Sequence, residues 1–68
     1  MVDVEIRGDM IRLGQLLKLS GLADSGGEAR ALLDEGAVTV NGKAESRRGR
    51  QLGAGDVVAV GEEMVRVV

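Results

Sequence analysis

Residues 36–43, Gly-Ala-Val-Thr-Val-Asn-Gly-Lys, decide the fold of this chain. Gly36 can adopt the left-handed conformation that commonly ends a helix. Val38-Thr39-Val40 alternates apolar and polar residues, as a half-buried strand does. Asn41-Gly42 favours a two-residue hairpin turn, because both turn positions require positive φ. The stretch therefore predicts the end of a helix, a strand, a tight turn and a return strand that begins near Lys43-Ala44.

Two short helices are predicted before this stretch. The second begins at the capping box Ser25-Gly26-Gly27-Glu28, in which the serine accepts from the third helical N–H and the glutamate reaches back. The first runs from Asp9, or from one turn later, to about Leu19. Their apolar residues at helical spacing are Leu13, Leu16 and Leu17 in the first and Ala29, Leu32 and Leu33 in the second. Matching stripes and a short connection predict that the two helices pack as a hairpin.

The remaining regular segments alternate with period two, which is typical of strands. Val2–Ile6 alternates aliphatic and charged residues, and two further strands are predicted at 57–60 and 64–68. The polar segment 45–50 is expected to be an exposed loop. The predicted fold class is α+β, with a two-helix hairpin packed on a small, mainly antiparallel β-sheet. One domain is expected to span residues 1–68.

The composition excludes several kinds of chemistry. The 68 residues include no cysteine, histidine, proline or aromatic residue, which rules out disulfides, thiol nucleophiles and an imidazole base. The acid pairs Asp34-Glu35 and Glu62-Glu63 lie at predicted element ends and form no obvious chelate. No enzyme activity, metal or cofactor is therefore expected. The longest apolar run, 57–60, is far below the ~20 residues of a membrane span. Since no cysteine indicates the redox compartment, the cytoplasm is taken as the default location.

Basic residues are concentrated in one segment of the chain. The net charge of the chain is −2, but residues 41–52 alone carry +3, from Lys43, Arg47, Arg48 and Arg50 against Glu45. A local positive patch can steer a polyanion even when the total charge is slightly negative. Arginine also suits bidentate contact with phosphate. The alternative interpretation is a solvated loop that binds nothing.

The start of the second helix is another candidate anion site. Glycines in Ser25-Gly26-Gly27 would let an anion approach free N–H groups at the helix N-terminus, although a capped helix without a ligand is the alternative. Arg12 and Lys18 on the first helix could border one groove with the basic loop. Arg30 on the second helix could join them or pair with Asp34 one turn later. Without aromatic residues, such a groove is expected to recognise RNA phosphates and shape more than bases.

The order of these residues resembles the RNA-binding domain of the ribosomal protein S-four type, also called the alpha-L motif. The matching residues are Arg12-Leu13, Leu16-Leu17-Lys18, Gly21-Leu22, Ser25, Ala29-Arg30, Leu33, Gly36, the stretch 38–43 and Gly55-Asp56-Val57-Val58. The resemblance covers residues 11–60, and Gly-x-Val-x-Val-Asn-Gly-Lys is its most specific part. Segment 45–50 and the glycine-opened helix are most similar to the small stand-alone bacterial RNA-binding proteins of the YbcJ type.

The resemblance implies that the helices and the following turn bind structured RNA, which in the family is often ribosomal or transfer RNA. The family positions with that role, together with the basic loop and the helix start, give the candidate site Arg12, Lys18, Ser25, Gly26, Gly27, Arg30, Lys43, Arg47, Arg48 and Arg50. Many members carry a basic residue directly after the serine. Gly26 stands there in this chain, which leaves backbone N–H contact at that position.

The sequence therefore predicts a cytoplasmic, monomeric RNA-binding module without catalysis, cofactor, small-molecule substrate or membrane contact. Its expected partner is ribosomal or transfer RNA, on the ribosome or on an assembly intermediate. The rival hypothesis is a protein-interaction module whose basic loop docks on an acidic ribosome-associated or assembly partner. DNA binding is a weaker alternative, because no helix carries the set of side chains that reads a major groove.

Overall fold

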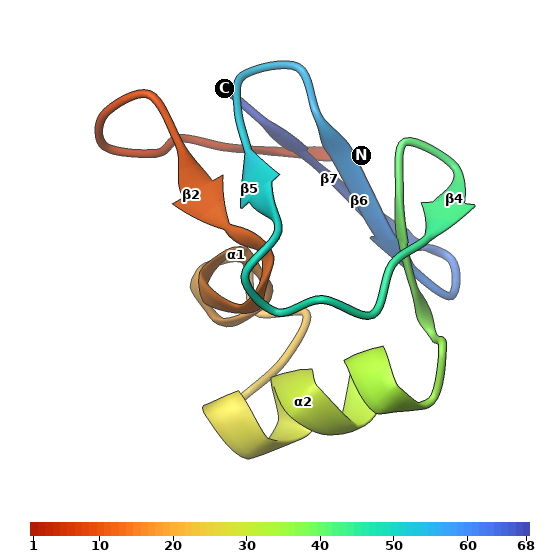
Figure 1. The fold of residues 1–68 in the computed structure, drawn as a ribbon. Helices are drawn as coiled ribbons and strands as arrows, with labels where there is room; N and C mark the ends of the chain where they lie inside the picture. The colour runs from red at the N-terminus through yellow and green to blue at the C-terminus, as the bar shows by residue number, and fades with distance from the viewer.

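Two α-helices and seven short β-strands make up the computed structural model, which describes all 68 residues (Figure 1). In chain order the elements are β1 (Val2–Val4), β2 (Ile11–Arg12), α1 (Leu13–Leu19), α2 (Gly26–Asp34), β3 (Val38–Val40), β4 (Lys43–Ala44), β5 (Gln51–Leu52), β6 (Val57–Val60) and β7 (Glu63–Val67). The α+β class is confirmed. No helix is both long enough and apolar enough to cross a membrane.

Five strands form one sheet in the order β1-β7-β6-β3-β4. All neighbours in it are antiparallel except β1 and β7, which are parallel. The register places Val40 opposite Val58, and Val58 opposite Val65, so that these valines share one face of the sheet. The strands β2 and β5 pair separately as a short antiparallel ladder. The mainly antiparallel sheet predicted from the sequence is therefore confirmed.

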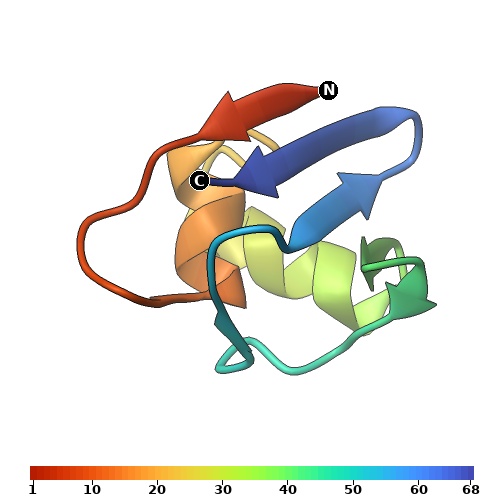
Figure 2. The same ribbon diagram turned by 90° about the horizontal axis from the view of Figure 1, so that it is seen from above.

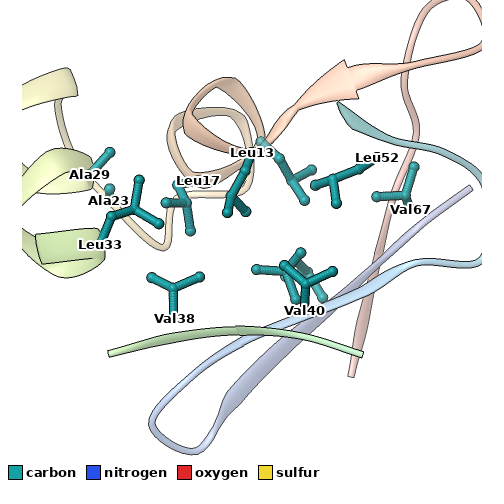
Figure 3. Close-up of a cluster of buried hydrophobic side chains, with 12 residues drawn as sticks. Leu13, Leu17, Ala23, Ala29, Leu33, Val38, Val40, Leu52 and Val67 are labelled. Atoms are coloured by element: carbon teal, nitrogen blue, oxygen red, sulfur yellow. The ribbon is translucent and has the colours of Figure 1, made fainter. Parts of the chain in front are cut away.

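The core lies between one face of this sheet and the two helices. Figure 3 shows buried side chains from α1, α2 and the strands that meet there, among them Leu17, Leu33, Val38 and Val40. Twelve residues are buried, and every one of them is hydrophobic. The α1 stripe predicted from the spacing of Leu13, Leu16 and Leu17 is fully buried. Aliphatic packing therefore holds the two helices on the sheet.

The turn at Asn41-Gly42 forms as predicted, with φ of 52° and 86° at its two positions. The Asn41 side chain also makes two hydrogen bonds that could not be predicted from the sequence. Its Nδ2 donates to Oδ1 of Asp56 at 3.0 Å, and its Oδ1 accepts from the Val57 N–H at 2.9 Å. The Asn41 bond, with a second from the Gly53 N–H, lowers the pKa of Asp56. The two bonds of the Asn41 side chain connect the turn to Asp56 and to the first residue of β6, which are fifteen and sixteen residues later in the chain.

The expectation that α1 begins at Asp9 is wrong, and the later of the two predicted starts is correct. The helix begins at Leu13, because Ile11 and Arg12 are extended and pair with Leu52 and Gln51. Two-residue strands such as β2 carry no detectable periodicity, so the sequence does not reveal this ladder. The pairing fixes the first turn of α1 next to the segment that precedes β5.

The helix α2 begins where the sequence predicts. Ser25 is the N-cap, and its Oγ accepts from the Glu28 N–H at 3.1 Å, so the serine half of the expected capping box is formed. Glycines with positive φ follow the ends of both helices, at Gly21 and Gly36. The helices are in contact, and α2 runs across the axis of α1 in both views (Figures 1 and 2). This crossing leaves the start of α2 open beside α1.

Candidate functional site

An open cleft lies between α1, the start of α2 and the segment that joins β4 to β5. Its volume is about 520 Å³. The residues that line it are Arg12, Gly14, Gln15, Lys18, Gly26, Ala29, Arg48 and Gly49. Three of them are cationic and none is acidic, so the cleft has the charge and the open shape to hold an anion. We call it the cation cleft.

Backbone carbonyls of the joining segment cap the first turn of α1. The Leu13 N–H donates to the Arg50 oxygen at 2.8 Å, and the Gly14 N–H donates to the Arg48 oxygen at 3.0 Å. An arginine at the N-cap has no side-chain acceptor, so these carbonyls satisfy two N–H groups of the first turn that have no partner within the helix. The segment is thus docked on α1, and the Arg48 backbone is held at the edge of the cation cleft.

Gly14 permits this close approach. A Cβ atom at this position would lie 3.2 Å from Cγ and 3.6 Å from the backbone oxygen of Arg48. A side chain there would push the arginine away from α1, since 3.2 Å is tighter than an ordinary van der Waals contact. A glycine inside a helix costs stability relative to alanine, and here it provides space for a cation.

Glu45 holds the segment between β4 and β5 together by hydrogen bonds and ion pairs within that segment. Its side chain is only 10% exposed, and Oε1 accepts from Nη2 of Arg47 and from Nη1 of Arg50, both at 3.1 Å. Its Oε2 accepts from the Ser46 N–H at 3.0 Å and from the Arg47 N–H and Nε, both at 3.2 Å. These bonds, those of the Arg47 side chain above all, lower the pKa of Glu45 from 4.5 to about 2.

The lowered pKa of Glu45 predicts that the stability of the fold decreases at acid pH. Because its folded-state pKa is depressed, the carboxylate contributes stability that is fully present above about pH 4.5 and is lost as the pH falls toward about 2. We expect the free energy of unfolding to fall less over this interval in a Glu45→Gln variant than in the original chain. Urea unfolding at several pH values in this range measures the difference. The carboxylate of Asp56 is present in both proteins and cancels, so parallel acid profiles would contradict the assignment.

The structure brings four of the ten candidate residues together in the cation cleft: Arg12, Lys18, Gly26 and Arg48. The side chains of these three cations make no ion pair. The six candidates outside the cleft lining are Ser25, Gly27, Arg30, Lys43, Arg47 and Arg50.

Most of those six have other contacts in the fold. Ser25 caps α2, Arg47 and Arg50 bind Glu45, and Arg30 lies 3.9 Å from Asp34, the pairing foreseen as its alternative. Lys43 lies on the edge strand β4 without an ion-pair partner. Whether these residues contact a ligand stays a prediction.

Sequence reasoning missed several residues that shape the cleft. Gln15 faces it, and its Oε1 accepts from the Arg12 N–H at 3.3 Å. Gly14 provides the approach described above, and Glu45 holds the segment that carries Arg48. Two signals were available. Gly14 interrupts a leucine-rich helix at some cost, and Glu45 is the sole acid in a basic segment.

Comparisons with known proteins cover almost the entire chain. The model of the S4 domain family matches residues 4–68. The “Probable ribosome maturation protein RlbA” of Bacillus subtilis (strain 168) is 47% identical over 57 residues, which are 84% of this chain and 80% of that protein. The “Putative RNA-binding protein YbcJ” of Escherichia coli (strain K12) is 38% identical over 58 residues, 85% of this chain and 83% of that protein. These matches confirm the resemblance seen in the sequence.

Proposed function

Because the chain belongs to the S4 domain family, we propose that it is a non-catalytic protein that binds structured RNA through phosphates held in the cation cleft. The observation that carries this proposal is the set of three cations, Arg12, Lys18 and Arg48, which converge on one cleft without a carboxylate in its lining. Guanidinium and ammonium groups bind phosphate oxygens by charge-assisted hydrogen bonds, which are the stronger kind. In this view α1 and α2 act as the alpha-L motif of the family.

The helix start adds neutral donors to the same cleft. Gly26 is the first residue of α2 and lines the cleft, and its missing side chain leaves the backbone open. The serine cap occupies the N–H of Glu28, so the N–H groups of Gly26 and Gly27 are the orphan donors of this helix. A phosphate beside them would gain from the helix dipole as well as from the cations. The helix start therefore supports the proposal that an anion such as phosphate binds in the cleft.

The names of two relatives suggest which partner to propose for this chain. The Bacillus subtilis relative is named for ribosome maturation and the Escherichia coli relative for RNA binding. We therefore place this chain, as a monomer in the cytoplasm, on ribosomal RNA of the ribosome or of an assembly intermediate, with transfer RNA as the other structured RNA to test. Arg30, Lys43, Arg47 and Arg50 would add outer contacts where the RNA extends beyond the cleft.

Salt dependence tests this proposal. Each phosphate neutralised contributes about 0.7–0.9 to the slope of log affinity against log salt, so three cleft cations predict a slope of about −2 to −3. Labelled fragments of bacterial ribosomal RNA and bulk transfer RNA serve as probes in a fluorescence titration. A slope of about −4 or steeper would add the outer cations to the interface. An affinity independent of salt would contradict phosphate binding, and a protein partner that survives nuclease treatment would support the rival docking function.

A further inference from the structure

A second hollow adjoins the cation cleft and has a different chemistry. It lies between α1 and the segment that joins β1 to β2, and its volume is about 420 Å³. Four aliphatic side chains line it: Ile6, Met10, Ile11 and Leu19. Leu19 is 58% exposed and Met10 is 40% exposed, so both side chains are accessible to a ligand in the hollow. We call this site the aliphatic hollow.

Gln15 joins the two sites, because it lines both of them. Successive helix residues are turned by about 100°, so Lys18 and Leu19 flank Gln15 on opposite sides of the exposed surface of α1. Lys18 belongs to the cation cleft and Leu19 to the aliphatic hollow. A ligand that crosses Gln15 would therefore pass directly from a cationic to an apolar surface.

The charges of the two sites differ in a way that selects their occupants. The charged residues that line the cleft are all cations, whereas the lining of the hollow includes one acid, Glu5, and one base, Arg7. Glu5 would repel a phosphate, but its carboxylate can accept a hydrogen bond from an amino group. Four aliphatic side chains favour an uncharged ligand with apolar faces. A nucleobase has these properties, and in RNA it lies next to a phosphate.

Gln15 also offers unused hydrogen-bond donors at the junction. Its Oε1 is engaged by the Arg12 N–H, which leaves both Nε2 protons without a protein acceptor. An amide with one end anchored presents its donors in a fixed direction, and base edges carry carbonyl and ring-nitrogen acceptors. The junction can therefore bind the edge of a base whose face rests on the aliphatic side chains.

We propose that an unpaired nucleobase of the bound RNA occupies the aliphatic hollow, with Gln15 contacting its edge and a neighbouring phosphate lying in the cation cleft. This inference rests on the function proposed above. Sequence-specific RNA recognition commonly uses unstacked bases of single-stranded loops. Such bases usually stack on aromatic rings, which this chain lacks. Exposed aliphatic side chains would take that role here, so that a base is bound as well as phosphates.

The test compares an RNA hairpin that has a single-stranded loop with the same hairpin carrying abasic loop residues. The two probes have the same phosphates and differ only in the bases. We expect the chain to bind the hairpin with bases about 3- to 10-fold more tightly, at an unchanged salt slope. A Met10→Gln, Leu19→Gln variant should lose most of this preference. Met64→Gln is the matched control, because Met64 is 43% exposed on β7 and lies outside the hollow.

The outcomes separate the hollow from the cleft. Equal affinity for the two hairpins, or a preference that survives in the Met10→Gln, Leu19→Gln variant, would overturn the base-binding hollow while leaving the phosphate cleft intact. If neither hairpin binds with a salt-dependent affinity, the proposed function itself is wrong and the hollow with it. A circular dichroism melt of each variant checks that the fold is retained, as expected for exchanges at exposed positions.

Discussion

An Arg12→Gln, Lys18→Gln, Arg48→Gln triple variant is expected to lose RNA affinity by about 100-fold or more. The three side chains line one cleft and make no ion pair within the protein, so their full charge is available to a ligand. Even about 1 kcal/mol from each contact, below the usual value for hydrogen bonds to charged groups, amounts to about a 100-fold change. The salt slope should flatten by about 2–3 at the same time. A fluorescence titration against ribosomal RNA fragments at several salt concentrations measures both quantities.

Two single substitutions, compared with each other, control for the change in net charge. Arg48→Gln and Arg66→Gln remove the same side chain and the same charge, but Arg66 pairs with Asp3 at 3.0 Å on the sheet. We expect Arg48→Gln to lower the affinity about 10-fold and Arg66→Gln to change it by less than about 2-fold. Equal losses in the two variants would show that diffuse charge, and not the cleft, attracts the RNA.

The arginine-rich segment shows where sequence reasoning ends. Composition identifies Arg47, Arg48 and Arg50 as one positive patch, and the three side chains are chemically equivalent in the sequence. In the fold, Glu45 binds the first and the third, while Arg48 lines the cleft. An irregular loop has no periodicity that would assign its side chains to a partner, so this division depends on the backbone path.

Elements with local signals were predicted well. The serine that caps α2 and the turn at Asn41-Gly42 each satisfy a rule that involves neighbouring residues only. Elements that depend on distant residues were not predictable in this way. The start of α1 is set by pairing with Gln51-Leu52, about forty residues later. The hydrogen bond from Asn41 to Asp56 likewise joins two turns, and the sequence around each turn gives no sign that they are in contact.

The same distinction explains which residues of the cleft lining could be selected from the sequence. Basic residue types and the glycine-opened helix pointed to an anion, because those signals lie in the side chains themselves. Gln15 carries no such signal, although it borders both the cleft and the aliphatic hollow. Its role follows from its place on the exposed surface of α1, which is defined only once Leu13, Leu16 and Leu17 are known to be buried.

A Leu17→Ala substitution is expected to have the largest effect on stability. Leu17 is fully buried and lies among Ala23, Leu33 and the sheet valines, at the contact between α1 and α2 (Figure 3). Removing a buried leucine side chain costs about 3–5 kcal/mol, because transfer energy is lost and a cavity remains. A domain of this size has a free energy of unfolding of roughly 3–10 kcal/mol. The variant should therefore lose a third to all of its stability, seen as a lower midpoint of urea unfolding.

Leu19→Ala is the matched control for Leu17→Ala, since it removes the same atoms from the same helix two residues later. Leu19 is exposed, so its truncation should change the free energy of unfolding by less than about 0.5 kcal/mol. If both variants were equally destabilised, Leu19 would have to be packed in the core, and the aliphatic hollow would not be available to a base. Stability should thus depend on Leu17 and binding on Leu19, because the two leucines lie on opposite sides of one short helix and face different environments.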